Sequence, residues 1–229
     1  MTVLPIPADG IFLVDKPTSW TSHDVVAWVR RQTGVKRVGH AGTLDPLATG
    51  LLIVLVGREA TKRQSEFMKQ EKFYQVRAQL GWESDTYDRD GKCQPVCEWK
   101  QLKKITPQIV TAALPQFIGT IEQRVPAYSA VKKHGVKLYE KARAGETVFA
   151  ELPVRTITIY SIALTQFVLD EEKQSLMVEL SVHCGSGTYI RSLVHDLGEK
   201  LSTGALVSEL RRTAIGEHQV SNAFQVVSD

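Results

Sequence analysis

The chain is poor in the features that mark exported, membrane-embedded or disulfide-stapled proteins. Only three of its 229 residues are cysteines, and an odd count at wide spacing does not make a disulfide framework. The longest apolar run, LLIVLV at residues 51–56, is far shorter than the about 20 residues that span a bilayer. The opening MTVLPIPADG lacks the basic start and apolar core of a signal peptide. We therefore expect a cytoplasmic protein with no membrane association.

Common ligand motifs are missing as well. The glycines of GHAGTLDPLATG, residues 39–50, fit neither G-x-G-x-x-G nor G-x-x-x-x-G-K-[ST], so neither kind of nucleotide cradle is predicted. Cys93 and Cys97 form one CQPVC pair without a second pair to complete a zinc site. His40 and Asp45 alone are too few to hold a metal ion. The sequence therefore predicts no metal site.

Charge is unevenly distributed although the net charge is only +3. Residues 1–150 hold 22 Lys and Arg against 15 Asp and Glu, whereas residues 151–229 hold 6 against 10. The densest basic stretch, RVPAYSAVKKHGVKLYEKAR, spans residues 124–143. Such a basic face indicates a polyanionic partner. The alternative is an ordinary solvated helical face.

Hydrophobic periodicity and capping residues predict alternating strands and helices. We expect strands at 10–17, 51–57, 72–81, 153–170 and 174–184, and helices at 21–34, 59–70, 106–119, 187–202 and 205–213. Residues 35–50 are expected to form one long loop. Residues from roughly 120 to 150 are expected to form a basic insertion at the rim of a mixed sheet. No repeat or linker divides the chain, so a single α+β domain is predicted over 1–229.

Asp45 is the residue of the long loop that most suggests chemistry. In a purely structural interpretation it caps a turn, and Pro46 fixes the next φ angle. A structureless loop of about sixteen residues is unusual in a compact domain unless it has a task. A carboxylate beside a buried strand also needs a cation to remain ionised. We expect Arg191, in the first turn of the helix at 187–202, to supply that charge.

Six blocks of the chain resemble the TruB-type tRNA pseudouridine synthases, which make pseudouridine-55 in the T-loop of tRNA. They occur in the family's order and cover most of residues 10–216. The blocks are GIFLVDKPTSWTSHDVV, GHAGTLDPLATGLLIVLVG, KFYQVRAQLGWESDTYDRDG, RVPAYSAVKKHGVKLYEKAR, CGSGTYIRSLVHDLGEKL and LVSELRRTAIG. The resemblance implies an α+β fold with a mixed, mainly antiparallel sheet flanked by helices.

The resemblance also implies three catalytic roles. Asp45 would be the catalytic aspartate, Tyr74 would stack on the flipped uracil, and Arg191 would pair with Asp45. A carboxylate suits the reaction as a nucleophile or as an electrostatic partner of an oxocarbenium-like sugar. Attack at C1′, addition to uracil and elimination through a glycal all remain open. No cofactor is implied, because no electrons or groups enter or leave.

Five further residues would bind the substrate. His40 would sit beside the flipped nucleotide, and Tyr189 and Leu210 would line the uridine pocket. Lys132 and Lys133, in the basic insertion, would contact phosphates. The alternatives are a capping or solvated histidine at 40 and ordinary core side chains at 74, 189 and 210.

The chain departs from the family pattern in two places. Ser186 stands where many relatives carry a lysine, and the chain ends shortly after LRRTAIG, where many continue into a small C-terminal RNA-binding domain. We expect a monomeric, stand-alone catalytic domain that acts on the tRNA T-arm stem-loop without an obligatory protein partner. Two alternatives remain: a tRNA-folding chaperone with secondary catalysis, and the catalytic subunit of a guide-RNA particle.

Overall fold

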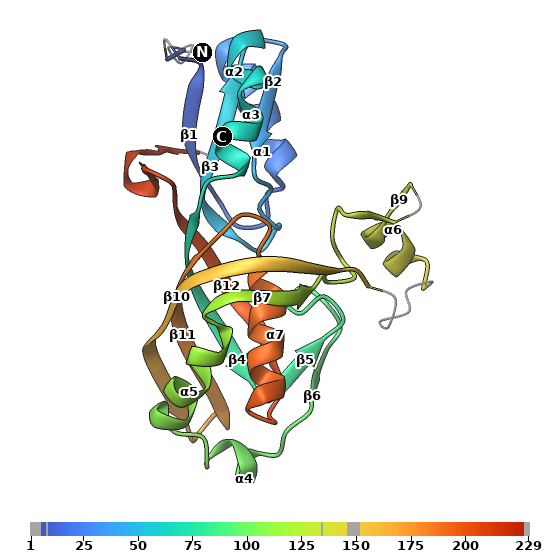
Figure 1. Ribbon diagram of the computed structural model, residues 1–229, viewed down its shortest axis with the longest axis vertical. Coiled ribbons are helices and arrows are strands. Elements are labelled where there is room, and N and C mark those ends of the chain that lie inside the picture. Colours follow the sequence, from blue (N-terminus) through green and yellow to red (C-terminus); the bar gives the residue numbers. More distant parts are fainter. Residues whose placement is uncertain (1–5, 8, 134, 146–151, 227–229) are drawn as a thin grey trace. The chain divides into compact units, whose positions relative to one another are not determined.

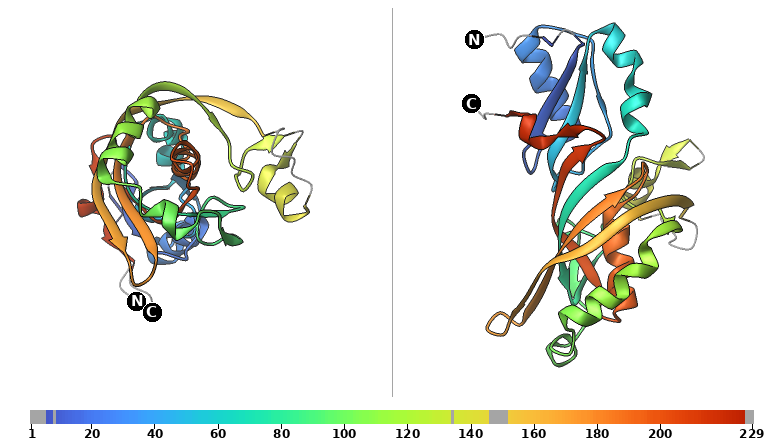
Figure 2. Two further views of the ribbon diagram at one scale, coloured as in Figure 1. Left: turned by 90° about the horizontal axis from the view of Figure 1, so that it is seen from below. Right: turned by 60° about the vertical axis from the view of Figure 1, so that its left-hand side comes forward.

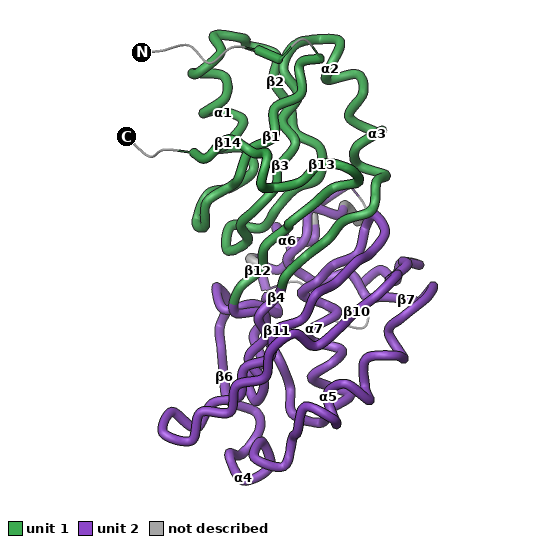
Figure 3. The backbone as a smooth tube through the Cα atoms, turned by 90° about the vertical axis from the view of Figure 1, so that its left-hand side faces the viewer, with its two compact units in different colours: residues 1–75, 209–229 green, residues 76–208 purple. Residues whose placement is uncertain are grey.

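The computed structural model describes residues 6–7, 9–133, 135–145 and 152–226. They belong to two compact units, residues 1–75 with 209–229, and residues 76–208 (Figure 3). The boundary falls inside two strands, β4 (Lys72–Leu80) and β12 (Ala205–Ile215). The single domain over 1–229 stays a prediction. The predicted α+β class with a large, mostly antiparallel sheet is confirmed.

The first unit has a sheet with helices packed against it (Figure 1). Strand β3 is its centre, because it pairs antiparallel with β1 and β2 and parallel with β12. The strands are β1 (Ile11–Lys16), β2 (Val38–Ala41), β3 (Thr49–Val56), β13 (His218–Gln219) and β14 (Phe224–Gln225); the helices are α1 (Ser22–Thr33), α2 (Arg58–Lys62), α3 (Gln64–Met68) and a 3₁₀ turn at Val220–Asn222.

Helix α1 forms where its capping residues predict. The Thr21 hydroxyl accepts the backbone N–H of Asp24, and the Asp24 carboxylate accepts the backbone N–H of Thr21. This reciprocal capping box satisfies donors that a helix leaves open at its start. Gly34 ends the helix in the left-handed conformation, at φ 70°. The buried face of α1, including Val25 and Val29, packs in one cluster with side chains of β1 and β3.

The second unit curves its strands around helix α7 (Figure 2). Strand β10 pairs antiparallel with β7 on one side and β11 on the other. The strands are β5 (Trp82–Ser84), β6 (Cys93–Pro95), β7 (Gly119–Arg124), β8 (Lys132–Lys133), β9 (Val136–Lys137), β10 (Val154–Asp170) and β11 (Ser175–Cys184). The helices are α4 (Trp99–Leu102), α5 (Pro107–Ala113), a 3₁₀ turn at Leu114–Phe117, α6 (Leu138–Arg143) and α7 (Ile190–Lys200).

The structure corrects three sequence-based expectations. The predicted helix at 205–213 is wrong, because these residues form strand β12, whose parallel pairing with β3 joins Arg211 to Thr49 and Arg212 to Gly50. The loop predicted over 35–50 contains β2, and the helix predicted over 59–70 is two short helices. Pairing with β3 decides the first two cases: for β12 this partner lies far away in the chain, and for β2 it is the next strand. Local propensity does not report such pairing.

The basic insertion builds a small core of its own. Its first residues pack Val125 and Ala127 against Leu138 of α6, and Tyr189 lies against the same cluster. Figure 1 shows β9 and α6 standing away from α7 and α5 within this unit. The predicted insertion overlaps β7 at residues 120–124, and residues 134 and 146–150 of it lie outside the described part of the chain.

Gly50, on β3, is a glycine that leaves no room for a side chain. Its φ is 100°, and an added Cβ would lie 2.2 Å from the carbonyl oxygen of Arg212. We expect Gly50→Ala to lower the free energy of unfolding by about 3 kcal/mol or more. In the control Gly34→Ala, where nothing lies within 4 Å, only the left-handed backbone penalty of about 1–2 kcal/mol applies. Urea unfolding of both variants checks this, and equal losses would contradict it.

Candidate active site

The Asp45 loop, residues 42–48, is anchored to the first residue of α1 and to the segment between β1 and α1. The buried Ser22 hydroxyl accepts the backbone N–H of Leu44 at 2.9 Å and lies 3.2 Å from the Leu44 carbonyl oxygen. The backbone N–H of Ser19 donates to the Pro46 carbonyl at 2.8 Å. These contacts fix the residues on both sides of Asp45, whose own side chain is partly exposed. The loop therefore offers a reachable carboxylate on a fixed backbone.

Lys16 places a buried ammonium group under this loop. Its side chain is fully buried, and its Nζ donates to the carbonyls of Pro17, Trp20 and Pro46 at 2.8, 2.6 and 3.2 Å. Burial lowers the pKa of Lys16 to about 8, and the negative charge of Asp45 opposes that decrease. Lys16 and Asp45 therefore interact electrostatically within the first unit.

Tyr74 and Leu210 come from two strands of the same unit. Tyr74 lies on β4 and is 8% exposed, and Leu210 lies on β12 and is 6% exposed. The Thr49 hydroxyl lies 3.5 Å from the Leu210 carbonyl oxygen, which joins β12 to the end of the Asp45 loop. The Thr213 hydroxyl donates to the Phe73 carbonyl at 3.3 Å. Hydrogen bonds of neighbouring residues therefore join β12, which carries Leu210, both to the end of the Asp45 loop and to β4, which carries Tyr74.

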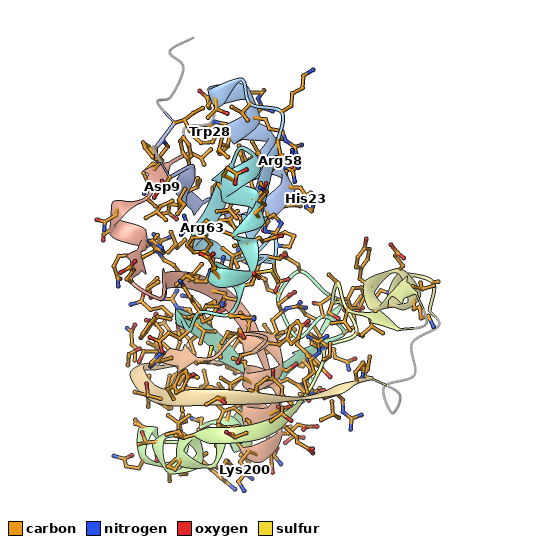
Figure 4. The ribbon with its side chains drawn as sticks, turned by 45° about the horizontal axis from the view of Figure 1, so that its top comes forward. Asp9, His23, Trp28, Arg58, Arg63 and Lys200 are labelled. Atoms are coloured by element: carbon orange, nitrogen blue, oxygen red, sulfur yellow. The ribbon has the colours of Figure 1, made fainter. Side chains whose placement is uncertain are left out.

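His40, on β2, is held as a neutral imidazole. Its side chain is partly buried, with Nδ1 shielded from solvent, and its ring meets the ring of His23 edge-on, with centroids 5.6 Å apart. Burial is the main cause, and the nearby charges of His23 and Arg212 add to it, so that together they lower the pKa of His40 to about 4. Figure 4 shows His23 projecting outward from α1. A neutral His40 fits the expected role of filling space beside a nucleotide.

We expect the C2 proton of His40 to titrate near pH 4 in an NMR experiment, assigned by comparison with His40→Gln. The ordinary pKa is about 6.5, so the unfolded chain binds this proton more readily than the folded one. The His40 contribution to stability is therefore complete above pH 6.5 and declines as the pH falls toward 4. A midpoint near 6.5 in the folded protein would contradict the buried, neutral assignment.

Arg191 is the buried cation of the second unit. It is 4% exposed, and its Nε lies 3.5 Å from a carboxylate oxygen of Asp88, which is 5% exposed. Its terminal nitrogens donate to the carbonyls of Thr86 and Tyr128 at 2.7 and 2.9 Å. Arg191 therefore connects α7 with the loop after β5 and with the start of the basic insertion. Its pairing with Asp45 joins residues of different units and stays a prediction.

Tyr189 is fixed in the second unit by a reciprocal pair of hydrogen bonds. Its backbone N–H donates to the Gln123 side-chain oxygen at 2.8 Å, and its carbonyl accepts the Gln123 amide at 3.0 Å. Gln123 lies on β7 and is buried. This bond pair orients the backbone just before α7, where no side chain caps the helix.

Lys132 and Lys133 lie together on strand β8, which pairs with β9 in a hairpin. The hairpin continues directly into α6. The backbone therefore carries both lysines on one short hairpin of the insertion, and their contact with phosphates stays a prediction.

A cavity of about 670 Å³ in the second unit lies outside the predicted residues. Its walls include Tyr87, Arg124, His195, Asp196 and Glu199. The Tyr87 and His195 rings stack with centroids 3.9 Å apart. Burial and the negative charge of Glu199 raise the pKa of Asp196 to about 6, although Arg124 opposes this. Of these wall residues, Arg124 is the first residue of the basic stretch, and the others received no role from the sequence.

Most of the supporting residues were not predicted from the sequence. Lys16, Ser22 and Arg212 hold the Asp45 loop, and Asp88 and Gln123 hold the segments around Arg191 and Tyr189. All of these residues except Gln123 lie within the quoted motif blocks but received no role. The informative signal was a charged residue inside an otherwise buried strand, at Lys16 and Arg212.

Comparison with known proteins identifies the relatives of this chain. Residues 30–190 match the TruB family pseudouridylate synthase N-terminal domain, and residues 191–228 match the tRNA pseudouridylate synthase B C-terminal domain. Over 218 residues the chain is 44% identical to tRNA pseudouridine synthase B of Thermobifida fusca (strain YX), covering 94% of this chain and 72% of that protein. The protein of the same name from Opitutus terrae is 42% identical, with 94% and 85% covered.

A solved structure shows a related fold. The crystal structure of an archaeal box H/ACA sRNP Nop10–Cbf5 complex matches 94% of this chain with a TM-score of 0.65 and 26% identity. The chain spans about half, 51%, of the length of the matched chain in that structure. The match at residues 191–228 falls on α7, β12 and the strands that follow, and the expected lack of a C-terminal RNA-binding domain stays a prediction.

Proposed function

The chain belongs to the TruB family of pseudouridylate synthases, RNA-modifying isomerases, and from this membership we propose that it converts one uridine in the T-loop of tRNA, at position 55, to pseudouridine. It acts as a monomer in the cytoplasm, without a guide RNA. The curated relatives named tRNA pseudouridine synthase B support tRNA as the substrate. The 26% identity to the box H/ACA structure is lower than the 44% to those enzymes, which favours this proposal over a guide-RNA subunit.

The observation that carries the proposal is the partly exposed Asp45 on a loop fixed by buried hydrogen bonds, with the Lys16 ammonium within electrostatic reach. The C1′–N1 bond breaks, the uracil turns, and C1′ joins C5, while the C5 hydrogen leaves as a proton and N1 takes up a proton, so that the product is an isomer of uridine. A preorganised carboxylate stabilises positive charge that develops at the sugar. From the family resemblance we further propose that Tyr74 stacks on the uracil, that Arg191 orients Asp45, and that Tyr189, Leu210 and His40 bind the nucleotide.

The target base lies inside a folded RNA loop, so it has to be extruded at a cost of a few kcal/mol. Recognition of a folded RNA relies on shape and phosphates more than on base edges. The basic insertion supplies the cations for this purpose, and Lys132 and Lys133 are its phosphate contacts.

We expect Lys132→Ala combined with Lys133→Ala to weaken T-arm binding and to reduce the slope of log K against log salt by up to about 2. The matched control, Lys103→Ala with Lys104→Ala, removes the same charge just after α4 and is expected to leave the slope at the wild-type value. Filter binding between 50 and 200 mM salt, a range in which ion release dominates affinity, measures both. Equal slopes for both double variants would remove the β8 lysines from the interface.

The function is tested by incubating the purified chain with an unmodified T-arm stem-loop and mapping pseudouridine. Conversion of one loop uridine without other components supports the proposal. Tight binding without conversion would replace it with a tRNA-folding chaperone. Conversion only after addition of a guide RNA and partner proteins would replace it with a guide-dependent subunit.

A further inference from the structure

Arg212 is a cation buried within a β-strand, which is an expensive place for a charge unless its partners are well placed. Its side chain is 1% exposed. The Nε donates to the Leu51 carbonyl at 2.8 Å, and a terminal nitrogen donates to the Gly42 carbonyl at 2.9 Å. These two acceptors lie on opposite sides of Asp45 in the sequence. One guanidinium therefore closes the base of the Asp45 loop.

The backbone on both sides of the loop is shaped around Arg212. Gly42 has a φ of 84°, a left-handed conformation that favours glycine, and a Cβ there would lie 3.4 Å from an Arg212 terminal nitrogen. Gly50 has a φ of 100°, and a Cβ there would collide with the Arg212 backbone. Gly50 thus permits the close approach of the Arg212 backbone, and Gly42 permits the left-handed turn at the start of the loop.

The charge of Arg212 also acts on the groups around the loop. Its positive charge contributes to the lowered pKa values of Lys16 and His40. Lys16 in turn donates to the Pro46 carbonyl and interacts with the Asp45 charge. Two buried cations of one unit, Lys16 and Arg212, therefore create a positive potential beneath the Asp45 loop.

We propose that Arg212 is a positioning residue for the reaction, which clamps both ends of the Asp45 loop through the Gly42 and Leu51 carbonyls and so fixes the carboxylate beside the reacting nucleotide. This inference rests on the proposed role of Asp45. Its neighbour Arg211 differs, because it is partly exposed and donates to both carboxylate oxygens of Asp15 at 3.0 and 2.6 Å. Arg211 also lies 3.3 Å from the Thr49 hydroxyl, but it bonds no carbonyl at the base of the loop.

The test compares Arg212→Met, Arg212→Lys and the control Arg211→Met in the full chain, with the T-arm stem-loop as substrate. Arg212→Met keeps a similar volume but removes both donors, and a displacement of about 1 Å costs on the order of 100-fold in rate. We therefore expect its single-turnover rate at saturating RNA to fall by about 100-fold, with RNA affinity within about threefold of wild type. Arg212→Lys keeps the charge but cannot replace the fork of donors, so its rate falls by about tenfold. Arg211→Met keeps the wild-type rate.

Hydrogen exchange of the amides at residues 43–48 gives a second measurement that does not depend on catalysis. Faster exchange in both Arg212 variants, but not in Arg211→Met, is expected. A wild-type rate in folded Arg212→Lys together with unchanged exchange would overturn the proposal, as would a rate loss explained entirely by weaker RNA binding. If Arg212→Met does not fold, Arg212→Lys decides. A wild-type chain without activity would instead refute the proposed function, and the exchange comparison would still test the clamp.

Discussion

Asp45→Asn is expected to lower the single-turnover rate of pseudouridine formation by about 10⁴-fold or more, as loss of a group that acts directly on the reacting atoms does. Asparagine has nearly the same shape, so the contacts of the loop backbone with Ser19, Ser22 and Arg212 remain. RNA binding should therefore keep its wild-type affinity. Release of tritium from uridine labelled at C5 measures the rate, because that hydrogen leaves when C1′ joins C5.

The control for this prediction is Asp24→Asn, which removes a carboxylate from the same unit. Asp24 is exposed and caps α1 through Thr21, so its loss costs about 1 kcal/mol of stability and leaves the rate unchanged. Activity retained by Asp45→Asn, or lost equally by Asp24→Asn, would show that the charge at residue 45 is not the reacting group.

Arg191→Met is expected to lower the free energy of unfolding by about 3–5 kcal/mol, the typical cost of breaking one side of a buried ion pair. The substitution leaves the Asp88 carboxylate, which is 5% exposed, without its cationic partner. The carbonyls of Thr86 and Tyr128 also lose donors, which should loosen the start of the basic insertion. Thermal unfolding monitored by circular dichroism measures the loss.

A double variant separates the cost of the unpaired Asp88 charge from the cost of the lost hydrogen bonds to the Thr86 and Tyr128 carbonyls. Arg191→Met with Asp88→Leu removes both charges and should recover part of the stability, because no buried carboxylate is left unpaired. The control Arg77→Met breaks the half-exposed pair with Glu179 and should cost about 1 kcal/mol or less. If Arg191→Met costs no more than Arg77→Met, the buried network around Arg191 does not stabilise this unit.

Sequence patterns were sufficient where the information is local. Thr21, Asp24 and Gly34 marked the ends of α1 because capping depends on neighbouring residues. The continuous apolar run at 51–56 marked β3 as buried, and all of its residues are buried. The basic insertion was predicted from its charge and stays a prediction. The family match, not periodicity, selected Tyr74, Tyr189 and Leu210, since each would otherwise pass as an ordinary core residue.

Long-range contacts explain what the sequence did not reveal. ALVSELRRT has apolar spacing compatible with a helix or a strand, and only the pairing of Arg211 with Thr49 and of Arg212 with Gly50 makes it β12. The same pairing brings Arg212 to Gly42, 170 residues away in sequence. Likewise, no sequence pattern indicated that Asp88, in a polar loop, pairs with Arg191, because the two residues are far apart in the chain.

The proposed function requires that this chain alone isomerises a T-loop uridine by means of Asp45. A decisive experiment maps every uridine of a full-length, unmodified tRNA transcript after incubation with wild-type protein and with Asp45→Asn at equal fractions of bound RNA. We expect one pseudouridine, at position 55, with the wild type and none with the variant. The same pseudouridine from both proteins, or an unchanged transcript with the wild type, would refute the role of Asp45 or the proposed activity itself.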